Sequence, residues 1–460
     1  MQSSQSRTRQ GATRLAVNRL KKTRKEGFVI RLSTRKVYVW TETQHISPHG
    51  FLFWGQGDPM LRLTFLTCTL LADIVAREVR ELSLPLAVGD ASVPDTIDHS
   101  EHSVLRLERA TGFRMAQIAD VHLEGEASNR ESYLANVRAV LDGQQLPIDL
   151  AVLSGDQVTG ERLLHDQADA WTMLTEELQS RSIPHTAVLG NHDAAPYLGG
   201  RVSQREYDEN QDSAGAESSR VDLMTQDAAM VLSLSQLAPA ALRPATSTYV
   251  VDVLLPNGST PLLSLFHLDT GGGGMKQDVR AVQAQWFRDE LLARRSTLGG
   301  EGGELGGVPP VLVFTHIPLH AYTAAWEAGA CFGERRDTIR PPMDGDGDEE
   351  LMNTIEEFPE VVAVFSGHDH CNDFCCASAT GSTQLCYGRH STPGGYTCAD
   401  YPLGMRIIEI VVLEAPTECE VVGGCGAWRV ETHVALVNGS IIHAGVLAEG
   451  GGAIGRKRRE

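Results

Sequence analysis

The sequence predicts an α/β fold, because short apolar segments alternate with segments of helical periodicity from residue 113 onward. The apolar segments have the length of buried strands and are bounded by polar or glycine-rich stretches. The expected strands are Phe113–Ala119, Asp149–Ser154, His185–Leu189, Leu262–Leu268, Val311–Thr315 and Val361–Phe365. The expected helices are Glu131–Leu141, Asp166–Gln179 and Val279–Arg294. Several short strands between about residues 384 and 446 predict an edge or a second sheet packed on the first.

Composition excludes several classes of protein. The chain has 460 residues, of which 42% are hydrophobic and 22% charged, and this is typical of a globular protein. No apolar run reaches the roughly 20 residues that a membrane-spanning helix needs. The formal net charge of −19 argues against nucleic acid as a general partner, because phosphate backbones bind Lys and Arg. We therefore expect no membrane span and no nucleic-acid partner.

Charge and hydropathy divide the N-terminal part of the chain. Residues 1–50 hold 11 Lys and Arg against two Glu, a net charge of +9, so the remainder carries −28. We expect residues 1–59 to be a disordered basic extension, and residues 60–111 to be an apolar segment followed by a linker. Met60 opens an apolar run of about ten residues that is typical of a secretory signal. An ordinary buried helix is the alternative interpretation of this run.

Five short polar clusters follow apolar strands in chain order. They are Asp120-Val121-His122, Gly155-Asp156, Gly190-Asn191-His192-Asp193, Thr315-His316 and Gly367-His368-Asp369-His370. Each cluster alone is a weak signal, because a strand-end histidine or a Gly-Asn turn is common. In open α/β sheets, however, ligands bind beyond the carboxyl ends of the strands. Five strand ends that deliver polar side chains to one edge would build one site.

The side chains of these clusters suit transition metals. They supply two carboxylates, one amide oxygen and four imidazoles, a mixed nitrogen and oxygen set that magnesium and calcium do not prefer. Seven ligands are too many for one tetrahedral ion, but they fit two ions that share a bridging carboxylate. Two ions about 3.5–4 Å apart form the clamp used for in-line phosphoryl displacement. The expected cofactors are two divalent or trivalent transition-metal ions: iron, zinc or manganese.

The clusters resemble the signature blocks of the calcineurin-like metallophosphoesterase superfamily. A narrower match lies around Gly367-His368-Asp369-His370 and continues into Asn372-Asp373-Phe374-Cys375. This block resembles the one found in a subgroup that contains small plant purple acid phosphatase-like proteins and a fungal dosage-dependent cell-cycle regulator phosphatase. The resemblance implies a four-layer α/β/β/α sandwich of two mixed sheets over residues 112–412. Residues 413–460 would then add C-terminal strands that complete the sheet, followed by a disordered Gly- and Arg-rich tail.

The resemblance also implies a role for each site residue. The first metal ion would be held by Asp120, His122 and His370, and the second by Asn191, His316 and His368, with Asp156 bridging both. His192 would point at the phosphate, and Asp193 would orient or electrostatically support His192. True purple acid phosphatases carry a tyrosine three residues after the bridging aspartate, where this chain has Thr159. The protein should therefore not be purple.

The implied activity is hydrolysis of phosphomonoesters, on a small molecule or a phosphoprotein, by metal-activated water. A phosphodiesterase or nucleotide hydrolase on the same metal core is the alternative, and a non-catalytic scaffold is a more remote one. Eight cysteines within residues 331–425 and the sequons at Asn257 and Asn438 suggest disulfides in a secretory setting. The expected location is cytoplasmic, or secretory or vacuolar if translation starts at Met60. The sequence leaves the oligomeric state open.

Overall fold

The structure is a computed structural model that describes residues 28–33, 36–41, 103–108, 112–163, 167–193, 213–256, 261–272, 276–298, 308–342, 347–413 and 428–450. The chain divides into two units, residues 1–93 and residues 94–460. In the first unit, β1 (Phe28–Ser33) and β2 (Lys36–Thr41) pair antiparallel. The sequence analysis expected no strands here, although both segments are rich in β-branched and aromatic residues. The apolar run after Met60 lies outside the described residues.

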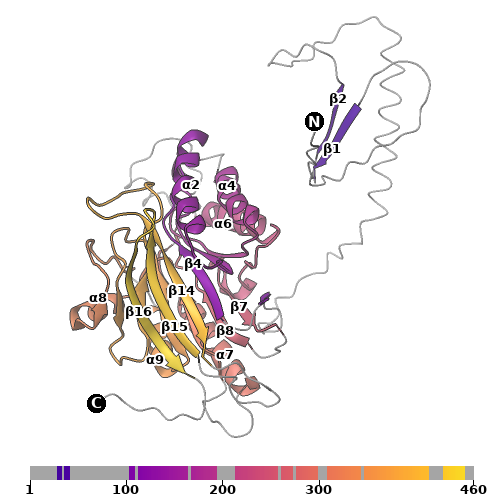
Figure 1. Cartoon of the computed structure of the whole chain (residues 1–460). Coiled ribbons are helices and arrows are strands. Elements are labelled where there is room, and N and C mark those ends of the chain that lie inside the picture. The colour runs from indigo at the N-terminus through magenta and orange to yellow at the C-terminus, as the bar shows by residue number, and fades with distance from the viewer. Residues whose placement is uncertain are drawn as a thin grey trace, which may run out of the picture. The chain divides into compact units, whose positions relative to one another are not determined.

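The second unit contains a six-stranded mixed sheet (Figure 1). Its strand order is β16-β15-β14-β4-β5-β6, with β4, β5 and β6 parallel and the other pairs antiparallel. The strands are β4 (Gly112–Ile118), β5 (Leu150–Ser154), β6 (His185–Val188), β14 (Gly404–Val412), β15 (Trp428–Leu436) and β16 (Ile441–Gly450). Because parallel strands end at the same edge, β4, β5 and β6 bring their carboxyl ends together.

An eight-stranded mixed sheet has the order β10-β12-β13-β11-β9-β8-β7-β3. Strands β8, β9, β11 and β13 run parallel, and their neighbours β7 and β12 run antiparallel to them. The strands are β3 (Ser103–Arg106), β7 (Tyr249–Leu254), β8 (Pro261–His267), β9 (Val311–Phe314), β10 (Cys331–Phe332), β11 (Val361–Ser366), β12 (Cys375–Ala377) and β13 (Gln384–Tyr387). The parallel strands β9 and β11 supply the second set of strand ends for the site.

Both faces of the eight-stranded sheet are apolar, and one of them packs against the six-stranded sheet. In β9, Leu312 and Phe314 join the core shared with the six-stranded sheet, whereas Val311 and Val313 join a second core on the opposite face. This alternation follows from the two-residue period of a strand. Helices α7 (Ala281–Leu298), α8 (Ala321–Ala328) and α9 (Asp348–Glu357) contribute to the second core. The first core includes side chains of α2 (Ala127–Asp142), α4 (Gln167–Ser180) and α6 (Ser213–Ala228).

The predicted α/β class and the two mixed sheets are confirmed, and helices flank the sheets to give four layers. Each of the six expected strands is present within two residues of its expected ends. The strands β3, β7, β10 and β12 and the helices α3 (Gly160–Leu163), α6, α8 and α9 were not predicted. Strands β15 and β16 extend the six-stranded sheet beyond residue 413, and the tail after residue 450 lies outside the described residues. Among the described residues, no helix has the length and apolar character needed to cross a membrane.

Candidate metal centre

All five polar clusters lie just beyond strand ends. Asp120 and His122 follow β4, Asp156 follows β5, and the Asn191–Asp193 cluster follows β6 in the six-stranded sheet. In the eight-stranded sheet, His316 follows β9, and His368 and His370 follow β11. A buried amide links the two sheets at this edge, because Gln117 Nε2 donates to Ser154 Oγ at 3.0 Å and to the Ser366 carbonyl at 3.2 Å. The two sheets therefore deliver their clusters to a common place.

Asp120, His122 and His370 form a first group of candidate ligands, and one ligand atom from each lies within 4.8 Å of the others. The Nε2 atoms of His122 and His370 are 3.0 Å apart. His370 Nε2 lies 3.8 Å from Asp120 Oδ1. All three residues are buried. Two ring nitrogens and a carboxylate oxygen that converge in this way match the donors expected at a transition-metal site.

Asp156, His316 and His368 form a second such group, and Asn191 joins it. His316 Nε2 lies 3.0 Å from Asp156 Oδ2 and 3.0 Å from Asn191 Oδ1. His368 Nδ1 lies 2.9 Å from the same Asn191 oxygen. Asp156 Oδ2 is also 3.6 Å from His122 Nε2 in the first group. Asp156 thus reaches both groups, as a bridging carboxylate must.

The backbone is strained at these positions. Asp120, His122, Asp156 and His368 all have φ between 48° and 73°, in the left-handed region that non-glycine residues rarely adopt. Backbone strain of this kind clusters at functional sites, where the surrounding structure over-determines it. Gly190 allows the close approach of the loops, because a Cβ there would lie 2.2 Å from Asp156 Oδ1.

Burial keeps most of the histidines neutral. It lowers the pKa of His368 to about 3 and that of His370 to about 4, and it holds the pKa of His122 well below its usual range. Burial alone would lower the pKa of His316 too, but the Asp156 carboxylate raises it to about 9. A neutral imidazole is the form that binds a metal ion.

The two carboxylates behave differently. Burial raises the pKa of Asp120 to about 7, and the charge of Asp156 adds to this effect. Burial also raises the pKa of Asp156, but His316 and neighbouring imidazoles outweigh it and hold this pKa well below the usual range. Two carboxylates buried together among mostly neutral rings favour bound cations, which are often the largest charges in such sites. The donor set and its electrostatics therefore fit two metal ions.

Three of the candidate histidine ligands are oriented by a contact of their other ring nitrogen. His316 Nδ1 donates to the Ser154 carbonyl at 3.1 Å, and His370 Nδ1 donates to the Tyr396 carbonyl at 2.6 Å. His122 Nδ1 lies 3.1 Å from Thr159 Oγ1. Thr159 occupies the position at which purple acid phosphatases carry tyrosine, and here its hydroxyl contacts a candidate ligand from behind.

His192 lies beside the candidate ligands and is only half buried. Its backbone N–H donates to Asp156 Oδ1 at 2.7 Å. Its ring packs edge-on against His122, with 5.2 Å between centroids. His192 thus lies at an accessible position next to the donor groups, and its expected contact with the phosphate stays a prediction.

Asp193 is buried behind the loop that carries Asp156, and its expected support of His192 stays a prediction. Its buried carboxylate accepts backbone hydrogen bonds of 2.7–3.0 Å from Asp156, Gln157, Val158 and Gly190. These bonds join the loop after β5 to the loop after β6. Asp193 is therefore a positioning residue that fixes the backbone around Asp156, and burial raises its pKa to about 6.

Sequence reasoning missed two buried residues behind Asn191. Arg220, on α6, donates to the Gly190 carbonyl at 2.7 Å and to Asp269 Oδ1 at 2.6 Å. Asp269 in turn accepts the backbone N–H of Gly271 at 2.8 Å. Asp269 directly follows an expected strand, which was an available signal. Arg220 offered no such signal in the sequence, because it lies in a segment without clear periodicity.

Six of the eight clustered cysteines form disulfides. The pairs are Cys331–Cys376, Cys371–Cys398 and Cys375–Cys386. This agrees with the expectation of disulfides in the cluster. Cys68, Cys419 and Cys425 lie outside the described residues.

The strand-end clusters form two candidate metal-binding groups, and comparison with known proteins identifies the family. The sequence model of the calcineurin-like phosphoesterase family matches residues 113–372, more than half of the chain, and the protein belongs to this family. The chain is 28% identical to "Probable inactive purple acid phosphatase 14" of Arabidopsis thaliana over 57% of its own length and 63% of that relative.

Two further matches extend the comparison. The chain is 25% identical to "Phosphatase DCR2" of Saccharomyces cerevisiae over 60% of its length and 47% of that protein. The structure of purple acid phosphatase PPD1 from yellow lupin aligns with a TM-score of 0.44 and 12% identity, covering 74% of this chain and 54% of the other. The chain thus spans less than two thirds of each of these three proteins.

Proposed function

We propose that this protein is a phosphatase that hydrolyses phosphomonoesters, of a small molecule or a phosphoprotein, with two transition-metal ions. The proposal rests on one observation above all: seven candidate donors converge from five strand ends in two groups, and Asp156 lies within 3.6 Å of ring nitrogens from both. The half-buried side chain of His192 lies beside these donors and is accessible for contact with a substrate.

In this proposal Asp120, His122 and His370 hold the first ion, and Asn191, His316 and His368 hold the second, with Asp156 shared. When bound, the two ions would supply Lewis acidity and lower the pKa of a water nucleophile. The chain itself orients the ligands, because the Ser154 and Tyr396 carbonyls fix the tautomers of His316 and His370.

His192 is the proposed catalytic residue of the chain. Its backbone is anchored on Asp156, so its imidazole is held at a fixed place relative to the bridging carboxylate. From there it can donate a proton to the leaving oxygen or stabilise the charge that develops on the transferred phosphoryl group. In this proposal Asp193 orients or electrostatically supports His192, and its carboxylate also fixes the backbone around Asp156.

Assays on p-nitrophenyl phosphate and bis(p-nitrophenyl) phosphate, with Mn²⁺, Fe²⁺ or Zn²⁺ added, test the proposal. We expect metal-dependent hydrolysis of the monoester in preference to the diester, and loss of this activity in Asp156→Ala. A preference for the diester would support the alternative of a phosphodiesterase or nucleotide hydrolase. Full activity of Asp156→Ala would rule out the shared-carboxylate centre.

A non-catalytic scaffold is the second candidate, because the Arabidopsis relative is named inactive. That alternative expects at least one ligand position to be lost. All seven positions and His192 keep a suitable side chain here, which favours the enzyme. A metal-loaded protein without activity on either ester would support the scaffold.

A further inference from the structure

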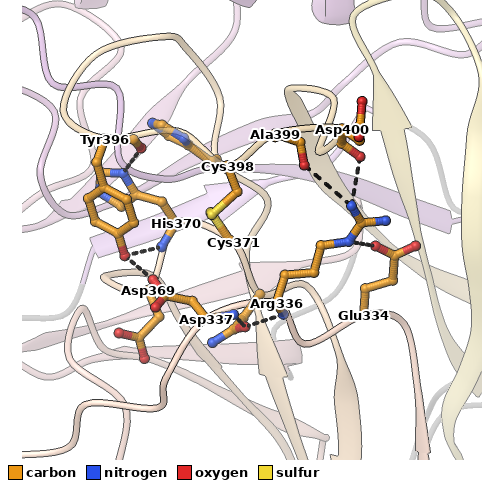
Figure 2. The surroundings of a disulfide bond; sticks show 12 residues. Glu334, Arg336, Asp337, Asp369, His370, Cys371, Tyr396, Cys398, Ala399 and Asp400 are labelled. Atoms are coloured by element: carbon orange, nitrogen blue, oxygen red, sulfur yellow. Dashed lines mark hydrogen bonds and ion pairs between the residues drawn. A yellow bond between two sulfur atoms is a disulfide. The ribbon is translucent and has the colours of Figure 1, made fainter.

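A short segment that sequence reasoning did not connect with the site covers one of its ligands. We call residues 390–400 the strap. At its start it is tied to the loop after β4, because Thr392 Oγ1 donates to the Val121 carbonyl. From Gly395 to Asp400 it forms no strand, and all of its residues except the half-buried Cys398 are exposed. Figure 2 shows this outer part beside His370 and the Cys371–Cys398 disulfide.

Tyr396 of the strap holds His370 from three directions. The two rings stack in parallel, with 4.0 Å between centroids and 5° between planes. The Tyr396 carbonyl accepts the His370 Nδ1–H at 2.6 Å, and the Tyr396 hydroxyl accepts the His370 backbone N–H at 3.1 Å. With Nδ1 engaged in this way, Nε2 of His370 is left to face His122 and Asp120.

The outer strap depends on a few anchors because it has no sheet or core packing of its own. The Tyr396 side chain is 41% exposed. Its hydroxyl contacts Asp337 and Arg340, and Arg336 donates to the Asp400 carbonyl at 2.9 Å. Asp337 is half-buried, but Arg336 and Arg340 are exposed side chains, which hold a backbone weakly. The disulfide is the covalent anchor of this part.

The position of the disulfide in the chain makes it effective. Cys371 directly follows His370 and is fully buried, and Cys398 lies two residues after Tyr396. The bond therefore joins the backbone next to the ligand to the backbone next to the residue that orients it. A cross-link of this kind removes the freedom by which the exposed strap could move away from His370.

We propose that the Cys371–Cys398 disulfide and Tyr396 act together as a positioning device for the first metal group, and that they raise its affinity for a metal ion selectively. This inference rests on the proposed two-metal function. The ligands of the second group have other contacts, because His316 is oriented by the Ser154 carbonyl and His368 faces Asn191. Loss of the disulfide should therefore weaken the first site and spare the second.

The test compares two variants of the full-length protein, each of which lacks one disulfide. Cys371→Ala/Cys398→Ala removes the strap disulfide, and Cys331→Ala/Cys376→Ala removes a bond between β10 and β12 that contacts no candidate ligand. The two bonds close loops of comparable length, with sequence separations of 27 and 45, so both variants should lose stability. Mn²⁺ affinity at each site is measured by chelator competition, and paramagnetic resonance distinguishes a coupled ion pair from a single ion.

We expect Cys371→Ala/Cys398→Ala to bind the first ion at least about tenfold more weakly, as is common when a ligand loses its outer partner. It should retain the second ion and show the uncoupled Mn²⁺ spectrum. The control variant should bind both ions like the unaltered protein. Equal affinities in the two variants, or an equal loss at both sites, would overturn the inference.

Two Tyr396 variants keep the inference testable if the disulfide variant does not fold. Tyr396→Phe retains the stacked ring and the carbonyl, so it should retain most first-site affinity. Tyr396→Ala removes the ring and should lose the first ion selectively. Unchanged first-site affinity in Tyr396→Ala would contradict the positioning role. If the unaltered protein binds no metal at all, the proposed function fails, and this result is distinct from a failure of the inference.

Discussion

Arg220 and Asp269 form a fully buried ion pair behind Asn191, with 2.6 Å between the guanidinium nitrogen and the carboxylate oxygen. Arg220 also donates to the Gly190 carbonyl, and Asp269 accepts backbone N–H groups from Thr246, Ser247 and Gly271. The pair thus fixes two loops at the edge of the second ligand group. It explains why α6, which contributes no candidate ligand, matters for the site.

Replacement of Arg220 by leucine should destabilise the protein by about 3–5 kcal/mol, because it leaves the Asp269 charge buried without its partner. Urea unfolding of the unaltered protein and of Arg220→Leu measures this difference in the free energy of unfolding. Arg288→Ala is the matched control, since it breaks an exposed pair with Glu357 and should change stability little. Equal effects of the two changes would show that the buried pair has no special structural role.

Gly190→Ala should disturb the metal centre without touching a ligand. The new Cβ would lie 2.2 Å from Asp156 Oδ1, so the shared carboxylate must move. We expect metal content and hydrolysis to fall together. Gly329→Ala is the control, because that glycine ends α8 at φ 79° with nothing within 4 Å of its Cβ position. Gly329→Ala should lower stability through backbone strain and leave metal content intact.

His192→Ala should retain both metal ions and lose rate. An imidazole that transfers a proton or stabilises developing charge typically contributes about 10²–10⁴-fold. Measured kcat for p-nitrophenyl phosphate should fall within that range, while metal analysis is unchanged. Loss of metal in this variant would mean that His192 is a ligand and that its assigned role is wrong.

His267 should make stability depend on pH. It is fully buried, it stacks against Tyr249, and burial lowers its pKa to about 3. As pH falls below about 6.5, the unfolded chain takes up a proton there that the folded protein does not, so stability falls. Titration of His267 should therefore lower the free energy of unfolding by about 2 kcal/mol between pH 7 and pH 5.

Unfolding of His267→Phe at both pH values isolates this contribution. The phenyl ring can keep the stacking on Tyr249 and on Phe314, whose centroid is 5.6 Å from that of His267. Over the same pH interval, the free energy of unfolding of the variant should fall by about 2 kcal/mol less than that of the unaltered protein. Identical pH dependence of the two proteins would show that His267 titrates normally in the folded state.

The sequence predicted the parts of this molecule that depend on local pattern. Apolar runs such as Val311–Thr315 gave the strands, and polar residues directly after them gave the candidate ligands, because strand ends meet at one edge. The strap could not be predicted in this way. The contact between Tyr396 and His370 joins residues 26 apart through a loop without periodicity. The backbone hydrogen bonds of Asp193 could not be predicted either, because their donors are N–H groups, which leave no trace in residue type.

Asp156 is proposed to join two metal sites, and the metal content of the purified protein tests this most directly. Elemental analysis after loading with Mn²⁺ or Zn²⁺ and removal of free metal should give close to two ions per chain. The same analysis of Asp156→Ala should show a loss at both sites, because both groups approach this carboxylate. One ion or none in the unaltered protein, or two ions retained by Asp156→Ala, would contradict the account.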